Sequence, residues 1–134
     1  MNNSELMSLA VKARENSYSP YSNFCVGAAL LAKNGKVYLG CNIENSAFGP
    51  SICAERVAIF KAVSEGVKEF EAIAIIGGKV GEKGGLASPC GVCRQVMAEF
   101  CDEDFKLVLG DENNVEEYTL KTLLPLAFTP KNLQ

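Results

Sequence analysis

A chain of 134 residues with 48% hydrophobic and 22% charged residues is long enough to bury one core and has the composition of a globular protein. No apolar run approaches the ~20 residues that cross a bilayer, and the N-terminus lacks the basic start and apolar centre of a signal peptide. We therefore expect a cytoplasmic protein without a membrane partner. The net charge of −3, without a basic cluster, argues against DNA or RNA and favours a small or neutral ligand.

The first predicted element is a helix, because apolar residues recur at helical spacing near the N-terminus, namely Leu6, Leu9, Ala10 and Ala13. Ser4 has the residue type that caps such a helix. A serine-rich loop over residues 17–23 then precedes two apolar, strand-like segments, 24–32 and 36–43. Asn34-Gly35 between them suits the tight turn of an antiparallel hairpin.

The second half of the chain alternates between strand and helix. A helix after the turn-like residues 45–51 ends at Gly66, and the apolar segment 70–78 predicts a buried strand. The next helix covers 90–101. Two further strands and a turn are predicted before the closing segment, in which two prolines limit helix: a strand over 105–110, a turn over 111–114 and a short strand over 115–120.

This order of elements predicts a single α/β domain over residues 1–134, with helices on both faces of a sheet of about five strands. The hairpin should be antiparallel and the strands joined through helices parallel, so the sheet should be mixed. The sequence shows no internal repeat, linker or low-complexity segment.

Two of the six cysteines stand three positions apart in SPCGVCRQ, residues 88–95. Behind Pro89, Cys90 and Cys93 would share one side of the first turn of a helix, where free N–H groups and the helix dipole favour thiolates. The pair by itself fits a metal site, a redox couple or two unreactive thiols. Without an export signal we expect reduced cysteines, and the chain has no histidine to complete a zinc site.

Cys53, at the start of the other predicted helix, supplies a third sulfur. Two helices on one sheet can direct their N-termini to the same point, and three protein ligands with an open fourth position are typical of catalytic zinc. We therefore predict one Zn²⁺ per chain, bound by Cys53, Cys90 and Cys93. The remaining cysteines have apolar neighbours and are interpreted as buried hydrophobic residues: Cys25, Cys41 and Cys101.

Glu55 follows Cys53 by two positions and can exchange protons beside the open position. Taken alone, it is better interpreted as a solvated glutamate stabilised by the helix dipole, whereas beside three predicted ligands the proton-transfer role is favoured. Arg56 is either a surface arginine or a donor to a ligand sulfur. In the second case it would withdraw charge from a three-thiolate zinc site, whose net charge of about −1 weakens the metal as a Lewis acid.

These motifs together resemble a known family. Cys-Ala-Glu at 53–55 followed by Pro-Cys-x-x-Cys at 89–93 resembles the zinc-dependent nucleoside and nucleobase deaminases. With YSPYSNFCVGAAL at 18–30 and NIEN at 42–45, the chain resembles the small cytidine deaminases over nearly its whole length. Relatives acting on tRNA, polynucleotides or deoxycytidylate generally have histidine as the first ligand. This chain has Cys53 there and contains no histidine, which agrees with a free nucleoside as the substrate.

The resemblance implies a three-layer α/β/α fold and hydrolysis of cytidine, and of deoxycytidine, to uridine or deoxyuridine and ammonia in pyrimidine salvage. Zinc would activate water for attack on C4 of the base, and Glu55 would carry protons from that water to N3 and to the departing amine. Phe24 and the backbone of Ala54 would lie against the base. Asn42 and Glu44 would bind a hydroxyl of the ribose, although polar residues at this position are also typical of an ordinary strand end.

The family resemblance also implies a homotetramer in which neighbouring subunits complete each site. Phe48 and Phe128 match, by position, aromatic residues that reach across those interfaces; the alternative is two ordinary core phenylalanines within one chain.

Three other functions stay open: a deaminase of another cytosine compound such as blasticidin S, a non-catalytic zinc-stabilised module, and a redox protein that does not need Cys53. The glycine-rich segment 77–85 lacks the Lys-Ser/Thr ending of a phosphate loop, so it predicts a solvated loop.

Overall fold

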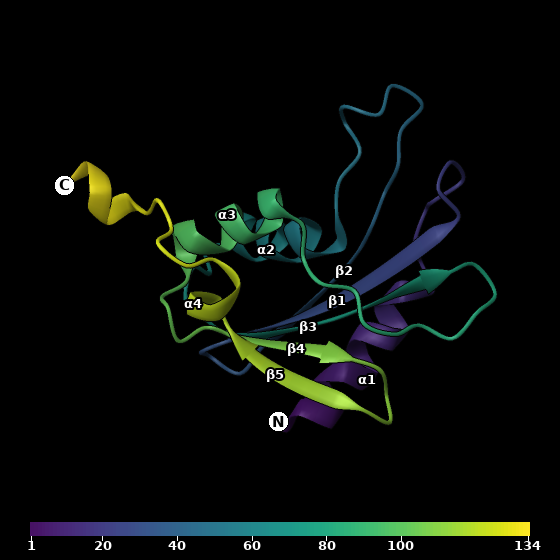
Figure 1. The fold of residues 1–134 in the computed structure, drawn as a ribbon, viewed down its shortest axis with the longest axis horizontal. Coiled ribbons are helices and arrows are strands. Elements are labelled where there is room, and N and C mark those ends of the chain that lie inside the picture. Colours follow the sequence, from purple (N-terminus) through teal and green to yellow (C-terminus); the bar gives the residue numbers. More distant parts are fainter.

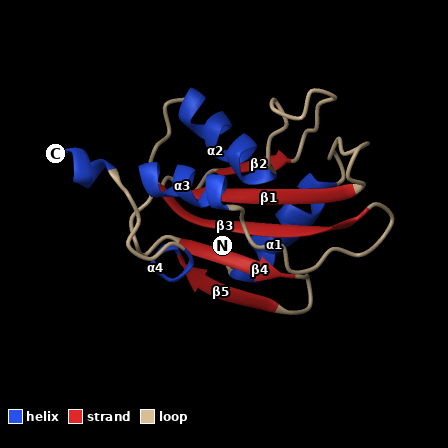
Figure 2. Ribbon diagram, turned by 45° about the horizontal axis from the view of Figure 1, so that its top comes forward, coloured by secondary structure: helices blue, strands red, loops and turns tan.

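A five-stranded sheet lies between two layers of helix, with α1 on one face and α2 and α3 on the other (Figure 1; Figure 2). The computed structural model describes all residues 1–134. Its elements are α1 (Asn3–Arg14), β1 (Phe24–Ala32), β2 (Val37–Cys41), α2 (Ala54–Ser64), β3 (Phe70–Lys79), α3 (Gly91–Phe100), β4 (Lys106–Gly110), β5 (Val115–Thr119), α4 (Leu120–Leu123) and a 3₁₀ turn (Pro130–Leu133). None of these helices combines the length and the apolar character needed to span a membrane.

The strands run in the order β2-β1-β3-β4-β5. β1 pairs antiparallel with both β2 and β3, β3 and β4 are parallel, and β4 and β5 are antiparallel. The mixed sheet and the hairpin are therefore confirmed. Gly35 at the hairpin turn has φ of +90°, a conformation that glycine adopts without strain. Both helical connections join strands of the same direction, and only the one through α3 joins neighbours in the sheet.

Alternating residues of the central strands face two separate cores, as the two-residue period of a strand requires. In β1, Ala28 and Leu30 pack in the core under α2 and α3, whereas Ala29 and Leu31 pack in the core under α1. The strand segments predicted from apolar runs are thus buried on both faces, which explains why they show no polar alternation.

The N-cap of the first helix lies two residues before its predicted position. Asn2 is the N-cap: its side-chain oxygen accepts from the backbone N–H of Glu5 at 2.8 Å, and its own N–H donates to the Glu5 carboxylate at 3.0 Å. This reciprocal capping box satisfies two free donors of the helix end. The assignment of Ser4 as the cap was therefore wrong, because Ser4 already lies within the first turn.

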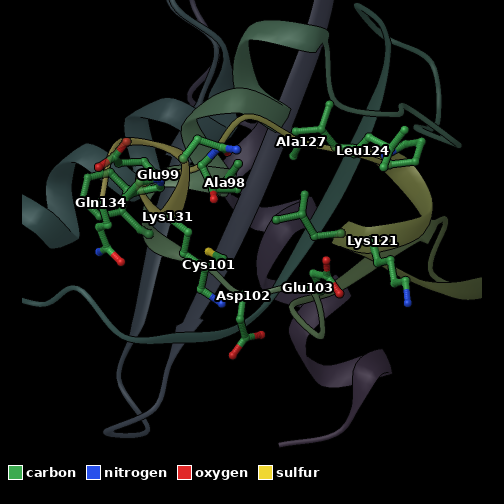
Figure 3. A pocket seen from close by; sticks show the side chains of 17 residues that line it. Ala98, Glu99, Cys101, Asp102, Glu103, Lys121, Leu124, Ala127, Lys131 and Gln134 are labelled. Carbon is green, nitrogen blue, oxygen red and sulfur yellow. The ribbon is translucent and has the colours of Figure 1, made fainter.

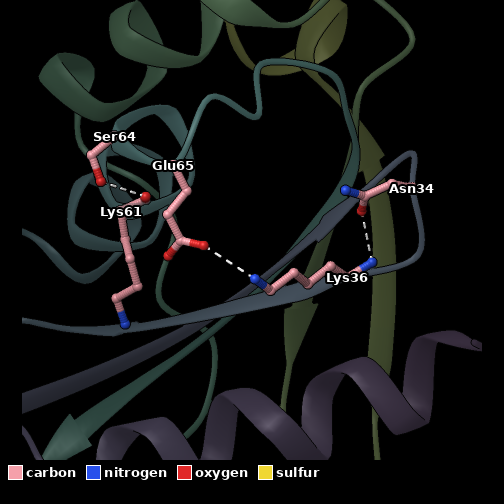
Figure 4. A network of polar contacts seen from close by, with 5 residues as sticks. All are labelled: Asn34, Lys36, Lys61, Ser64 and Glu65. Atoms are coloured by element: carbon pink, nitrogen blue, oxygen red, sulfur yellow. Dashed lines mark hydrogen bonds and ion pairs between the residues drawn. The ribbon is translucent and has the colours of Figure 1, made fainter.

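An exposed polar network joins the hairpin turn to the end of α2 (Figure 4). The side chain of Asn34 accepts from the Lys36 backbone N–H at 2.8 Å, and the Lys36 ammonium lies 3.1 Å from a Glu65 carboxylate oxygen. Both charged side chains are exposed, so this ion pair contributes little to stability. Close backbone packing holds α2 on the sheet instead.

Two glycines allow helices to approach the sheet at backbone distance. A Cβ on Gly40 in β2 would overlap the carbonyl oxygen of Ala54 and lie 2.7 Å from the amide nitrogen of Ala58, both in α2. On the opposite face, a Cβ on Gly27 in β1 would lie 2.8 Å from the Cα of Arg14, at the end of α1. Each glycine therefore fixes how closely one helix lies on the sheet.

We predict that Gly40→Ala lowers the free energy of unfolding by about 2–3 kcal/mol, because the added methyl group meets rigid helix backbone. Gly85→Ala is the matched control: its Cβ would meet nothing within 4 Å, and its φ is not in the left-handed region. Its effect should stay within about 0.5 kcal/mol. Urea denaturation of both variants measures the difference, and equal midpoints would show that α2 can move away from β2 without cost.

Candidate active site

Two helix N-termini bring three sulfur atoms together. Cys53 is the N-cap of α2, Cys90 is the N-cap of α3, and Cys93 lies in the first turn of α3. Their Sγ atoms all lie within 4.8 Å of one another, and those of Cys53 and Cys90 are 3.8 Å apart. No disulfide joins them. The structure thus gathers the three cysteines that the sequence predicts as ligands.

Hydrogen-bond donors surround these sulfurs. The backbone N–H of Cys93 donates to Cys90 Sγ at 3.4 Å, and Arg56 Nη2 donates to Cys53 Sγ at 3.5 Å. The pKa of the Cys53 thiol falls to about 5, chiefly because the Cys93 thiol hydrogen-bonds to it and also because Arg56 does. The pKa of Cys93 is raised by the same hydrogen bond and by burial. These shifts favour the thiolate form of Cys53.

The donor set fits zinc. Three soft sulfur ligands suit Zn²⁺, and three protein ligands leave a fourth position for a reacting molecule. Cys93 is buried and Cys90 is exposed, so the cluster opens to one side. That side is a cavity of about 270 Å³, close to the lower end of the range for small-ligand pockets, which begins at roughly 300 Å³.

The cavity gathers the residues that the sequence analysis assigned to the base, the sugar and proton transfer. They are Phe24, Asn42, Glu44, Ala54 and Glu55, beside Cys53 and Cys90. Several lining residues were not predicted: Val26, Ser51, Ile52, Ile75, Ala87 and Ser88. Val26 could have been found, because it shares a strand face with Phe24. The others come from loops and another strand, whose convergence no local pattern reveals.

Glu55 is the buried carboxylate of the cavity wall, with 4% of its surface exposed. Burial raises its pKa to about 7, and the nearby Cys53 thiolate acts in the same direction. A carboxyl group with a pKa near neutrality can both accept and donate protons, as general acid–base catalysis requires. The alternative of a solvated first-turn glutamate is therefore wrong.

Arg56 lies against the cluster as well. Its guanidinium donates to Cys53, while its Nε is buried and has no hydrogen-bond partner. The alternative of a free surface arginine is therefore wrong, since one end of this side chain donates to the sulfur of Cys53.

Asn42 and Glu44 reach the cavity although β2 ends at Cys41, before either residue. The chain beyond the strand is held by bridges from Ile43 to Tyr18 and to Ile52, so the backbone continues between two other segments. The prediction that the strand extends to residue 43 was too long. Both residues nevertheless line the same cavity.

Both polar side chains already make bonds within the chain. Asn42 accepts from the backbone N–H of Val26 at 2.9 Å and donates to the carbonyl of Phe24 at 2.8 Å, which leaves one amide N–H free. Glu44 accepts from the backbone of Tyr21 at 2.9 Å and from both the backbone and the hydroxyl of Ser22. These hydrogen bonds, led by that of the Ser22 hydroxyl, lower the pKa of Glu44.

Phe48 and Phe128 lie outside this cavity. Phe48 is 68% exposed, has φ of +59°, and meets the ring of Tyr21 edge-on at 5.8 Å between centroids. Phe128 is 60% exposed, in the C-terminal segment that projects from the body of the fold (Figure 1; Figure 2). The alternative that both are core phenylalanines within one chain is therefore wrong.

A second, larger cavity of about 790 Å³ lies between the end of α3 and the C-terminal segment (Figure 3). It shares no residue with the cysteine cluster or its cavity. Its wall includes Leu126, whose side chain is fully exposed. Because the predicted chemistry lies elsewhere, the smaller cavity beside the cysteines is the candidate active site.

Comparison with known proteins assigns the family. The sequence pattern described as "Cytidine and deoxycytidylate deaminase zinc-binding region" matches residues 1–109. The chain belongs to this family. A cytidine deaminase from Sporosarcina psychrophila is 51% identical over 130 residues, which are 96% of this chain and 93% of the relative. The crystal structure of cytidine deaminase from Burkholderia pseudomallei has a TM-score of 0.87 at 44% identity and covers 96% of this chain and 100% of its own. The resemblance and the fold predicted from it are confirmed.

One relative of this chain is named for the alternative substrate, blasticidin S. A blasticidin-S deaminase from Bacillus cereus is 32% identical over 108 residues, which are 78% of this chain and 76% of its own length. It shares less sequence with this chain over a shorter range than the relative named cytidine deaminase.

We predict that Arg56→Ala weakens zinc binding by roughly tenfold or more, because Cys53 loses the donor that stabilises its thiolate. Lys61→Ala, which removes a positive charge from the other end of α2, is the control and should leave zinc binding unchanged. Competition with a chromogenic chelator measures both. Equal affinities in the two variants would show that Arg56 does not act on the metal centre.

Proposed function

We propose that this chain is a zinc-dependent enzyme that hydrolyses cytidine and deoxycytidine to uridine or deoxyuridine and ammonia, in pyrimidine salvage. The observation that carries the proposal is the buried Glu55 beside three gathered cysteine sulfurs in a small cavity. The 51% identity of this chain to a protein named cytidine deaminase supports the same reaction.

Cys53, Cys90 and Cys93 would hold one Zn²⁺ per chain, which when bound acts as a Lewis acid that lowers the pKa of water. Glu55 takes a proton from the attacking water and delivers it to N3 of the base, which makes C4 more electrophilic. It then takes the proton of the hydroxyl group now on C4 and passes it to the exocyclic nitrogen, so that the C4–N bond breaks, ammonia leaves and the C4 carbonyl forms. Its pKa of about 7 suits both steps.

The wall of the cavity favours an uncharged nucleoside. No lysine or arginine lines it, so nothing there would neutralise a phosphate. Phe24 supplies an apolar surface for the base, and the backbone of Ala54 lies beside it. Asn42 has one free N–H that can donate to a sugar hydroxyl, and the Glu44 carboxylate can accept a hydrogen bond from a sugar hydroxyl. The higher identity to the relative named cytidine deaminase supports a nucleoside over blasticidin S.

Two non-deaminase functions are less well supported. A structural zinc site would need a fourth protein ligand, and the metal-binding cluster contains three cysteines only. A redox site needs only Cys90 and Cys93, whereas Cys53 lies 3.8 Å from Cys90 and beside the buried Glu55. Zinc-dependent hydrolysis requires the three cysteine sulfurs and the Glu55 carboxyl group together.

We further propose a homotetramer in which Phe48 and Phe128 reach the cavities of neighbouring subunits. Both rings are largely exposed in the single chain, where they would otherwise add apolar surface to water. The cavity is also small and open on one side, so an aromatic ring from a neighbour would exclude water from the reacting groups.

We expect the purified protein to contain one zinc per chain and to convert cytidine to uridine. The loss of cytidine absorbance measures the conversion. Glu55→Gln should keep the zinc and the fold but lower turnover by at least ~10², because the amide cannot carry protons. Glu65→Gln at the far end of α2 is the control and should remain active. Metal-loaded Glu55→Gln with more than a tenth of normal turnover would refute the role of Glu55, and wild-type protein without deaminase activity would refute the proposed function.

Mixed tetramers test the role of Phe128. Glu55→Gln and Phe128→Ala chains, each nearly inactive alone, are unfolded together and reassembled. Some sites should then combine Glu55 of one chain with Phe128 of another, and activity should return in proportion to them. Mixing Glu55→Gln with Glu55→Ala is the control, which no arrangement can rescue. Verified hybrid tetramers without recovered activity, or a fully active monomer, would contradict the shared site.

A further inference from the structure

Arg14, the last residue of α1, bonds three separate segments of backbone. Its Nε donates to the carbonyl of Cys25 at 2.9 Å, its Nη2 to the carbonyl of Lys79 at 3.0 Å, and its Nη1 to the carbonyl of Glu82 at 3.0 Å. Neither ion pair of the chain includes it. All three nitrogens of the guanidinium therefore donate, and they connect the start of β1 with the end of β3 and the loop that follows it.

Glycines shape the space around this guanidinium. A Cβ on Gly78 would lie 3.1 Å from Arg14 Nη2, and one on Gly84 would lie 3.3 Å from Nη1. Gly77 faces the other side of the sheet, where a Cβ would lie 2.9 Å from the Phe24 ring and 2.8 Å from the Cβ of Ala87. Arg14 thus packs behind the sheet at the place where the candidate active site packs in front of it.

The loop held by Arg14 forms part of the active-site wall. Residues 80–90 lead from β3 to α3, and Ala87 on this loop lines the cavity together with Phe24. Gly77 and Gly85 exchange two backbone hydrogen bonds, of 3.2 and 2.8 Å, which return the loop to the sheet. Glycine loses more conformational freedom on ordering than any other residue, so such a loop needs external bonds to stay in place.

A different arginine holds the far end of the loop. Arg94 Nε donates to the carbonyl of Pro89 at 2.8 Å, directly before Cys90, and its Nη1 donates to the carbonyl of Leu123 at 2.6 Å. The metal-ligand end is therefore fixed independently of the glycine-rich end. Loss of Arg14 should loosen Ala87 and Phe24 without releasing Cys90.

We propose that Arg14 is a positioning residue of the active site: it holds the loop 79–87 and the start of β1 so that Ala87 and Phe24 form one wall of the substrate cavity. It acts from the opposite face of the sheet, through hydrogen bonds to backbone carbonyls. The identity of the substrate in this inference rests on the proposed function, whereas the control of the loop does not.

The experiment compares Arg14→Ala and Arg14→Lys with Lys12→Ala, which removes an exposed charge from the same helical turn and serves as the control. Amide hydrogen exchange of residues 79–87 should be about tenfold faster in Arg14→Ala, with α2 unchanged. The KM for cytidine should rise about tenfold while kcat stays within about threefold, because a loosened wall weakens the binding of substrate and transition state alike. Zinc content should stay at the wild-type level.

Arg14→Lys should fall between the wild type and Arg14→Ala in exchange rate and KM, since one ammonium cannot span three carbonyls as a guanidinium does. Wild-type exchange in the loop, or faster exchange with an unchanged KM, would overturn the inference. A raised KM together with similar losses of kcat, zinc content and protection from hydrogen exchange throughout the fold would also overturn it, because Arg14 would then act only on global stability. If the wild type fails to deaminate cytidine, the proposed function fails, and the exchange rates still decide whether Arg14 holds the loop.

Discussion

The candidate active site depends on helices that lie on the sheet at backbone distance. Gly40 lets the first turn of α2 rest on β2, so its missing side chain fixes where Cys53 and Glu55 stand relative to the sheet. α3 begins beside α2 on the same face, which brings the N-cap sulfurs of both helices together. Gly27 has the matching role on the other face, where it lets the end of α1 approach β1 and places Arg14 behind the cavity.

Gathering these groups creates an electrostatic problem that the same helices reduce. Three sulfurs and a buried carboxyl share one small volume, and the pKa values of Glu55 and Cys53 move in opposite directions. Donors face the sulfurs: Arg56 donates to Cys53, and the Cys93 backbone N–H at the start of α3 donates to Cys90. Burial raises the pKa of the Glu55 carboxyl group towards neutrality. The group can therefore hold a proton before a reaction and release it during the reaction.

Most of the fold and the clustering of three cysteines could be predicted because both are recorded in local patterns. Apolar runs located β1, β3 and β4, and the two Cys-containing helix starts located the cysteine cluster. The true N-cap is Asn2, which could not be told from Ser4 by residue type, because asparagine and serine both cap helices. The role of Arg14 could not be predicted, since its partners at Lys79 and Glu82 are 65 and 68 positions away and are backbone carbonyls, which no residue type identifies.

The distribution of basic residues explains how an acidic protein can build such a site without a basic surface. The chain has three arginines, and each holds one part of the site: Arg14 the glycine-rich loop, Arg56 the sulfur of Cys53, and Arg94 the segment before Cys90. None forms an ion pair, and all donate to carbonyls or sulfur. A rigid fork of several donors suits this work better than the single ammonium of lysine. The three arginines lie behind and beside the cavity. No arginine lines the cavity, which therefore remains suited to a neutral ligand.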